Sequence, residues 1–393
     1  MSYSKDNEKS LVGGEITSEK NLEFSLAFEI GALRLGLWLD SGGVEKLSLD
    51  EKQLAEAQLG ALRGFPESIK ALKALEAKEL IRNLEVRHQL RVQIDSLVEL
   101  GLIGALPESN QLGFIDINGE ERPLPEISDL VDVVERTIPL VEEKVSQGFT
   151  SLLLVPFGLP LRDYLNRYKA LILDKHKRRK LFSTKGSLLK LTKEDPIFTS
   201  SLNLRGELEF SDLGSFGRYF VDDFYEKNNG FTKQQLIAAN QVWQVLLVES
   251  LVDLPLQSSV EEIAGRRQFG PNRTPQDYLK LLKDDPYYEH EQGFTFESWL
   301  TMAMIHLLRT DQQIDVRGKL GGKGCTLLGS SIEVKEGNNY ESCIVRPGSA
   351  SWRGVGHADL RTAFPIWGKV GYYQSIRTAV NLTSLLDEYK KLI

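Results

Sequence analysis

Glycine recurs at short intervals through the last quarter of the chain, and this spacing constrains the fold more than any other feature of the sequence. From Val316 onward the glycines leave only short apolar pieces between them, including Cys325–Leu328, Ile332–Val334 and Phe364–Trp367. Runs of this length bounded by glycine are typical of strands joined by turns and loops, because a helix needs a longer periodic segment. The pattern predicts a region of small strands and long loops that ends in an alternating strand over Ile376–Leu382.

Upstream of this region, helical and extended patterns follow one another, which predicts an α+β fold class. The apolar run from Ser151 to Phe157 has the length and composition of a buried strand. A helix is expected from Ser128 to Val145 with a bend at Pro139, because proline removes a helical hydrogen bond. Capping residues predict three further helices, since a threonine side chain can accept the first free N–H groups of a helix. These caps are Thr232, with a helix to about Leu251, Thr274, with a helix through Leu282, and Thr295, with a helix to Leu308.

These patterns divide the chain of 393 residues into four parts. Residues 1–47 are expected to form a polar tail with short strands, and residues 48–104 a helical hairpin. Residues 105–200 are expected to form a small helix–strand–helix segment with a basic linker, and residues 201–393 the C-terminal domain. The hairpin fits either a coiled-coil oligomerisation arm or an ordinary pair of surface helices, because its heptads are not sustained.

Charge and hydropathy argue against two classes of protein. A formal net charge of -7 disfavours a general nucleic-acid binder, which needs a basic surface. No apolar run reaches the roughly 18 residues of a membrane span, and the polar N-terminus lacks the apolar core of a signal peptide. The sequence therefore predicts a soluble protein, cytoplasmic or virus-associated, that is not exported by the general secretory route. Cys325 and Cys343 either pair or remain two separate buried thiols, and the second interpretation is favoured.

A search for catalytic and metal-binding patterns leaves one candidate set for catalysis. No phosphate-binding loop, dinucleotide fingerprint or nucleophile elbow is present in the sequence. Cys343, His357 and Asp359 supply the thiol, the base and the orienting carboxylate that nucleophilic catalysis needs. The alternative is that Cys343 is a buried strand residue and His357 a surface loop residue. The histidines show no pair at metal-ligand spacing, so neither a metal nor a cofactor is expected, although His290 lies between two glutamates.

One basic stretch runs from Lys175 to Lys193 in a chain that is acidic as a whole. Clustered lysine and arginine side chains are typical of a site for nucleic acid or another anionic partner. The alternative is a solvated linker or helix end, and Phe182 is the only aromatic residue in the stretch that could stack on a base. The stretch supports, as an alternative function, an assembly protein that binds an anionic partner.

The order of features from about Phe294 to Leu382 resembles the C-type-lectin fold in its formylglycine-generating-enzyme-like version. The matching features are a capped helix over Thr295–Leu308, a glycine-rich turn, a Trp-Arg-Gly-Val-Gly loop at 352–356 and a terminal strand with Arg377. The resemblance implies a lectin-like domain within the C-terminal part. The closely coupled cysteines of formylglycine-generating enzymes are missing, as are the Glu-Pro-Asn and Gln-Pro-Asp triplets of calcium-dependent lectins, so neither activity is expected.

Within that fold, the chain is similar to the variable proteins of diversity-generating retroelements, which display diversified side chains on a rigid scaffold. The resemblance implies a ligand-binding face within residues 349–373, framed by Trp352 and the strand Arg377–Val380. Tyrosine, arginine, serine and glycine in this segment are also typical of binding hot spots and adaptable binding loops. The expected function is a non-enzymatic binding protein whose partner is a protein or surface ligand, with a homo-oligomer as an option. The expected ligand-binding positions are Ser349, Ser351, Arg353, His357, Asp359, Arg361, Ala363, Phe364, Tyr372 and Tyr373.

Overall fold

The centre of the fold is a four-stranded antiparallel sheet with the order β12-β19-β9-β4. Its strands are β4 (Ser151–Val155), β9 (Gln244–Val248), β12 (Glu291–Gly293) and β19 (Thr378–Asn381). Strands β4 and β9 are apolar along nearly their whole length and are buried on both faces. The expected buried strand at Ser151 is therefore confirmed. Because β4 pairs with β9, the expected segments 105–200 and 201–393 contribute to one sheet.

The computed structural model describes residues 85–191, 197–199, 217–219, 231–254, 262–263, 266–270, 273–315, 324–336, 339–346, 360–365 and 374–383. The chain divides into two units, Met1–Asn83 and Leu84–Ile393, and every described residue belongs to the second. The expected strands of residues 1–47 and the first part of the expected hairpin of residues 48–104 lie outside the described residues. Within the described ranges, no helix combines the length and the apolar character needed to cross a membrane.

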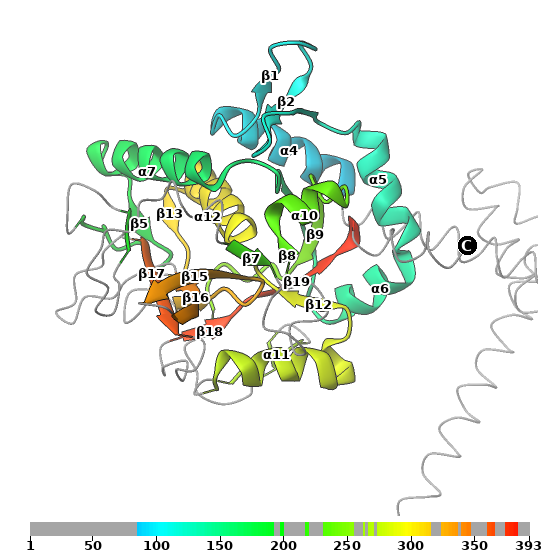
Figure 1. Ribbon diagram of the computed structural model, residues 1–393, viewed down its shortest axis with the longest axis vertical. Helices are drawn as coiled ribbons and strands as arrows, with labels where there is room; N and C mark the ends of the chain where they lie inside the picture. The colour runs from blue at the N-terminus through cyan, green and yellow to red at the C-terminus, as the bar shows by residue number, and fades with distance from the viewer. Residues whose placement is uncertain are drawn as a thin grey trace, which may run out of the picture. The chain divides into compact units, whose positions relative to one another are not determined.

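Helices α4 (Val86–Glu99) and α12 (Phe296–Thr310) pack against strand β4 and against each other, and α7 (Leu161–Lys177) packs against α12. Figure 1 shows α7 and α12 side by side. The apolar stripe of α12 is fully buried, and its Trp299 ring meets Tyr168 of α7 edge to face at 5.9 Å between centroids. The predicted cap of this helix is confirmed, because the Thr295 side chain accepts a hydrogen bond from the Ser298 N–H.

Smaller elements surround this centre. They are the three-stranded sheet β1 (Gly104–Ala105), β2 (Leu112–Ile115) and β3 (Glu121–Pro123), the helices α5 (Ile127–Arg136), α6 (Ile138–Ser146) and α11 (Pro275–Asp284), the 3-10 helix η2 (Pro286–Tyr288), the parallel pair β5 (Phe182–Ser183) and β13 (Gln312–Gln313), and the hairpin β10 (Glu262–Ile263) and β11 (Arg266–Arg267). The helix expected from Ser128 breaks at Thr137, close to Pro139, and the predicted start at Ser128 is wrong because Glu126 occupies the cap position. The predicted cap at Thr274 is confirmed, and Thr274 also forms a capping box with Asp277.

One predicted helix is wrong in its second half. The Thr232 capping box opens helix α10 (Lys233–Ala238) as expected, but the helix does not continue to Leu251. Asn240 adopts a left-handed conformation with φ 61°, which ends the helix. The apolar residues that follow form the central strand β9, because pairing with both β4 and β19 satisfies their backbone and buries their side chains.

The glycine-punctuated region forms small strands, and the coarse prediction of a mixed α+β chain is confirmed. A six-stranded sheet has the order β6-β17-β16-β15-β7-β8. Its strands are β6 (Ile197–Thr199), β7 (Gly217–Tyr219), β8 (Phe231–Thr232), β15 (Ser330–Glu336), β16 (Asn339–Arg346) and β17 (Leu360–Pro365), and a parallel pair joins β14 (Gly324–Thr326) to β18 (Gln374–Ile376). The expected terminal strand is divided at Arg377 into β18 and β19.

Strand β4 lies at an edge of the central sheet, and two glutamines one turn apart on α4 complete its hydrogen bonding. The Gln89 amide accepts from the Leu152 N–H at 2.7 Å and donates to the Thr150 carbonyl at 3.2 Å. The Gln93 amide accepts from the Leu154 N–H at 2.6 Å and donates to the Leu152 carbonyl. The two side chains therefore bond the strand edge as a neighbouring strand would, and so protect an edge that would otherwise be open to pairing.

Replacing Gln93 by leucine is expected to destabilise the protein by about 1–3 kcal/mol for each backbone group left unsatisfied, because Gln93 is buried and no water can replace it. Gln89→Leu is the matched control, with a smaller expected loss because Gln89 bonds the more exposed end of the strand. Urea unfolding of both variants measures the difference. Equal losses in the two variants would contradict the role given to the buried amide.

Candidate functional site

Two buried charge clusters hold two successive residues, Arg377 at the junction of β18 and β19 and Thr378 at the start of β19. Neighbouring residues of an extended chain project to opposite sides, so each residue reaches a different cluster. We call these the Asp315 cluster and the Glu291 cluster. Together they fix the strand that follows the expected ligand-binding segment 349–373.

In the Asp315 cluster, the guanidinium of Arg377 forms a two-pronged ion pair with Asp315. Nε donates to Oδ2 at 2.8 Å and Nη2 donates to Oδ1 at 2.6 Å, and both side chains are buried. The remaining N–H groups of Arg377 donate to the carbonyls of Leu251 and Val252. Burial by itself disfavours the charge, but the Asp315 carboxylate outweighs this effect and raises the pKa of Arg377. This fork geometry is one that lysine cannot reproduce.

The carboxylate of Asp315 is also tied to its surroundings by neutral donors. Its Oδ2 atom accepts a hydrogen bond from the indole N–H of Trp299 at 3.0 Å. The Asp315 N–H donates to Asp253, and Asp253 also accepts from Thr184. Burial raises the pKa of Asp253, and the neighbouring Asp315 charge adds to this effect. The cluster therefore joins α12, the loop after β9 and the C-terminal strand through one carboxylate.

Cys325 lies beside the same cluster as a free, fully buried thiol. Its free state bears out the expectation that the two cysteines do not pair. Burial raises the pKa of the thiol well above its usual range, and the negative charge of Asp315 adds to this effect. A thiol in such surroundings is a poor nucleophile, because the thiolate is the reactive form.

His306 of α12 lies near Arg377 and Asp315. Its Nε2 atom is buried and has no hydrogen-bond partner among the described residues. Burial lowers the pKa of His306, and the positive charge of Arg377 adds to this effect, while Asp315 opposes it. Burial and the Arg377 charge both favour the neutral form of the side chain.

We expect the free energy of unfolding to fall as the pH is lowered through about 6.5, the ordinary pKa of histidine. The unfolded chain takes up this proton near that pH, whereas the folded chain takes it up only at lower pH, so acid favours unfolding until the folded pKa is reached. Urea unfolding across about pH 5 to 8 should show that the free energy of unfolding changes less with pH in His306→Gln than in the wild type. His88→Gln, at an exposed position on α4, is the control and should leave the dependence unchanged.

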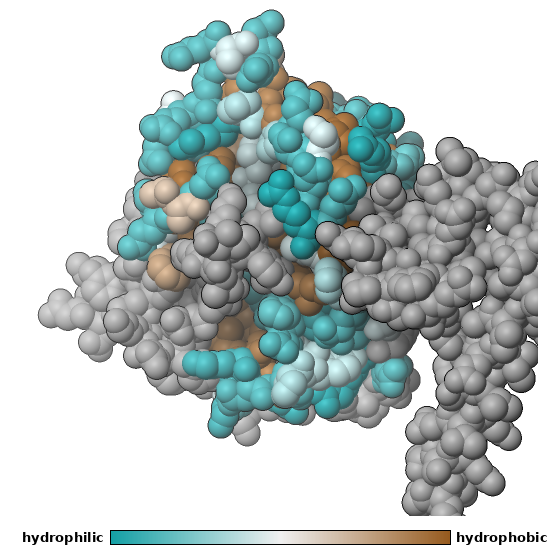
Figure 2. Space-filling model, turned by 90° about the vertical axis from the view of Figure 1, so that its right-hand side faces the viewer, coloured by the Kyte–Doolittle hydropathy of each residue, from teal (hydrophilic) through white to brown (hydrophobic). Residues whose placement is uncertain are grey.

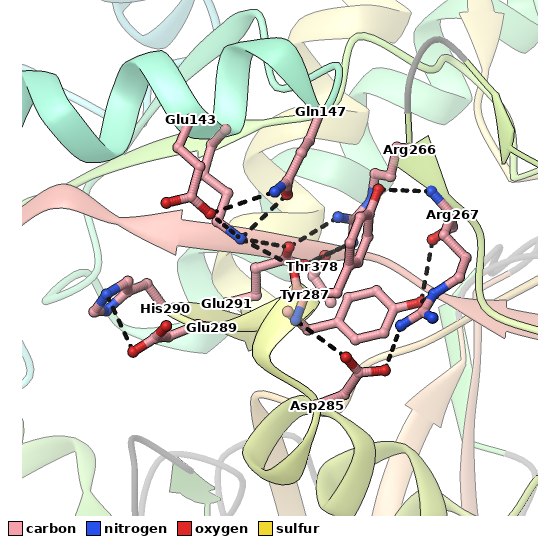
Figure 3. Close-up of polar contacts among 12 residues, drawn as sticks. Glu143, Gln147, Arg266, Arg267, Asp285, Tyr287, Glu289, His290, Glu291 and Thr378 are labelled. Carbon is pink, nitrogen blue, oxygen red and sulfur yellow. Dashed lines mark hydrogen bonds and ion pairs between the residues drawn. The ribbon is translucent and has the colours of Figure 1, made fainter. Parts of the chain in front are cut away.

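In the Glu291 cluster, one carboxylate of β12 binds two cations and the hydroxyl of Thr378 (Figure 3). Lys144 of α6 donates to Oε1 at 3.1 Å, and Arg266 of β11 donates to Oε1 at 2.8 Å and to Oε2 at 2.6 Å. Thr378 donates to Oε2 and accepts from Arg266. The side chains of Lys144 and Glu291 are fully buried, so the carboxylate is needed to offset two buried positive charges.

Arg266 and its neighbour Arg267 project to opposite sides of β11. The buried guanidinium of Arg266 pairs with Glu249 as well as Glu291, and it lies 4.5 Å from the ring centroid of Phe149. Arg267 is half-exposed, pairs with Asp285 and lies 4.7 Å from the ring centroid of Tyr287. Burial disfavours the charge of Arg266, but Glu249 and Glu291 outweigh this effect and raise its pKa. The two arginines thus join the aromatic residues around η2 to the sheet.

A third buried ion pair joins α10 to α12. Lys233 donates to Glu297 at 2.9 Å and to the carbonyl of Leu159, and its ammonium lies 5.2 Å from the ring centroid of Phe157. Burial lowers the pKa of Lys233, and the Glu297 charge opposes that shift. Like the two clusters, this pair connects elements that are distant in the sequence.

The glutamates beside His290 do not converge with it on a metal. Figure 3 shows Glu291 within its cluster and the side chains of Glu289 and His290 away from it. Glu289 and His290 are exposed, and His290 Nε2 lies 3.8 Å from Glu289 Oε1. Within the described ranges, no three acidic, histidine or cysteine side chains gather as metal ligands. The carboxylates of the buried clusters are each bound by cations, so their observed role is to hold elements together.

Most of the expected ligand-binding positions lie outside the described residues; these are Ser349, Ser351, Arg353, His357, Asp359, Tyr372 and Tyr373. The remaining three, Arg361, Ala363 and Phe364, belong to β17, of which the backbone is described. Val345 of β16 pairs with Thr362, whereas Cys343 pairs with Pro365, so β17 carries an extra residue at Ala363–Phe364. Such a bulge changes the direction of side chains and is common beside binding sites.

None of these contacts tests the alternative that Cys343, His357 and Asp359 form a catalytic set. Cys343 lies inside β16, opposite Ile332 and Pro365, while His357 and Asp359 lie outside the described residues. The sequence interpretation anticipated Arg377 as part of the frame but missed its partner Asp315 and the whole Glu291 cluster. A weak signal was present, because Arg377 follows Ile376 and precedes a small apolar run.

Comparison of the chain with protein-family models, with curated proteins and with solved structures gave no match.

Proposed function

We propose that this chain is a non-enzymatic binding protein that displays a ligand-binding face within residues 349–373 on a rigid α+β scaffold. We infer that the chain is similar to the variable proteins of diversity-generating retroelements and that its C-terminal domain is lectin-like. The display positions are those expected from the sequence, from Ser349 to Tyr373. The partner is a protein or surface ligand.

One observation carries this proposal: the strand directly after the face is fixed by two buried charge clusters. Arg377 is held by Asp315, and Thr378 is held by Glu291 and Arg266. Display of varied side chains needs a frame that does not change when the face changes, and binding surfaces gain affinity when they are preorganised. A buried frame linked to α12, β12 and α6 meets this need.

The bulge in β17 is a second support. It lies at Ala363–Phe364, two of the ligand-binding positions expected from the resemblance. An irregular strand position next to a binding surface re-aims side chains without interrupting the rest of the sheet. Pairing of β17 with β16 on one side and β6 on the other anchors the strand around this irregularity.

The proposal is tested with two libraries of the full chain on a display platform. In the face library, the ten display positions are randomised together; in the frame library, Arg377, Thr378, Ala379 and Val380 are randomised. Exposed positions away from special contacts change stability by only about 0.5 kcal/mol each. Most face clones should therefore stay folded and resist protease, whereas most frame clones should be degraded.

Selection of the face library against a probe protein, such as streptavidin, supplies the functional half of the test. Enrichment of clones that bind the probe and differ only at the display positions would support a display role. If the face library is degraded as fully as the frame library, those positions serve the core and the proposal fails.

A further inference from the structure

Helices α5 and α6 carry an acidic ridge, which we define as Glu126, Asp129, Asp132, Glu135, Glu142 and Glu143. All six side chains are exposed. Between Glu126 and Glu143 the sequence offers one cation, Arg136; the next one, Lys144, is buried against Glu291 and lies 3.9 Å from the carboxylate of Glu143. Figure 2 faces this side and shows a described surface that is largely hydrophilic. The ridge therefore presents a strong local excess of negative charge to solvent.

The end of α7 and the turn after it carry the opposite charge. We define the basic corner as Lys177, Arg178, Arg179, Lys180 and Lys190, all exposed. Two carboxylates lie among them: Asp174 pairs with Arg178 at 2.9 Å, and Asp311 binds Lys175 and lies 3.8 Å from Lys180. These two acids neutralise only part of the cluster. The corner therefore carries more exposed cations than are needed to interact favourably with the C-terminal end of α7.

From these two surfaces we infer that the basic corner binds the acidic ridge of a second copy of this chain. Figure 1 shows α7 and the pair α5 and α6 on opposite sides of the described unit, so one copy cannot satisfy both surfaces by itself. A contact between different surfaces of two copies is head to tail and can extend to further copies. The net charge of -7 disfavours binding of a long polyanion such as nucleic acid, which would also meet acidic parts of the surface. A compact acidic surface can contact the basic corner alone.

The expected association is weak and sensitive to salt. Exposed ion pairs contribute little individually, and about 0.1 M salt screens them beyond about 10 Å. Complementary surfaces mainly set orientation and the rate of encounter. This inference is independent of the display proposal, because α5, α6 and α7 lie outside residues 349–373.

Sedimentation velocity of the full chain tests the inference with two charge-reversal variants. The corner variant carries Lys177→Glu, Arg179→Glu and Lys190→Glu; the ridge variant carries Asp129→Lys, Asp132→Lys and Glu135→Lys. Wild type at about 0.05 M salt should sediment increasingly fast with rising concentration, and at about 0.5 M salt it should sediment as a monomer. Each variant alone should be monomeric, whereas an equimolar mixture should associate, because the intact corner of one meets the intact ridge of the other.

A third variant, which lowers the net charge by as much as the corner variant does, is the control. It carries Arg87→Glu, Arg91→Glu and Arg162→Glu, which replace exposed cations away from the corner. It should associate as the wild type does. A wild type that stays monomeric at low salt overturns the inference, as does a mixture that fails to associate. Binding of a short DNA duplex that the corner variant loses, without self-association of the wild type, would assign the corner to nucleic acid instead.

Discussion

Replacing Arg377 by leucine is expected to lower the free energy of unfolding by about 3–5 kcal/mol, the usual cost of removing one partner of a buried ion pair. The Asp315 carboxylate would remain buried and, within the described residues, would keep two donors, the Trp299 indole N–H and the Leu254 backbone N–H. The carbonyls of Leu251 and Val252 would lose their donor as well. Because domains are stable by only about 5–15 kcal/mol in total, this loss would shift the urea midpoint strongly.

Two further variants separate charge from geometry at this position. Arg377→Lys keeps the positive charge but cannot form the two-pronged pair, so its expected loss is intermediate. Adding Asp315→Leu to Arg377→Leu removes the unpaired charge and should recover part of the stability lost in the single variant. A single variant as stable as the wild type would show that the Asp315 cluster does not fix the strand.

Replacing Glu291 by leucine should lower the free energy of unfolding by about 3–5 kcal/mol, because buried Lys144 loses its closer carboxylate and keeps only the exposed Glu143, 3.9 Å from its ammonium. Arg266 keeps its contact with Glu249, so Lys144 bears most of the cost. Thr378 loses its acceptor in the same variant. Urea unfolding again gives the measurement, and Glu289→Leu, at the exposed neighbour, is the control with little expected change.

Adding Lys144→Met to Glu291→Leu tests the cause of that loss. If the cost comes from a buried, uncompensated ammonium, the double variant should be more stable than Glu291→Leu alone. If the cost comes from lost packing around β12, the second substitution should leave the stability unchanged or lower it further.

The features that could be predicted from the sequence are those encoded within a few residues. The caps at Thr232, Thr274 and Thr295 were identified because a capping side chain bonds the backbone only three positions away. The buried strand at Ser151 was identified because a wholly apolar run of that length is typical of one. These signals do not depend on the rest of the fold.

The features that were missed depend on contacts between distant residues. The run Val245–Val248 is apolar and follows a capped helix, so the local pattern cannot distinguish a longer helix from a central strand. Pairing of β9 with β4 and β19 makes it a strand. Asp315 and Arg377 lie 62 positions apart. The spacing of charged residues along the chain gives no sign that either one is buried, so the clusters could not be found.

The position of β19 sets the order in which the chain can complete its core during synthesis. This strand comes from the last residues that the structure describes, yet it lies between β12 and β9 rather than at an edge of the sheet. Until the ribosome has released it, β9 keeps one open side and both Asp315 and Glu291 lack a partner from the strand. The nascent protein therefore exposes an apolar strand edge until β19 has emerged from the ribosome, and such an edge can pair with other chains during that interval.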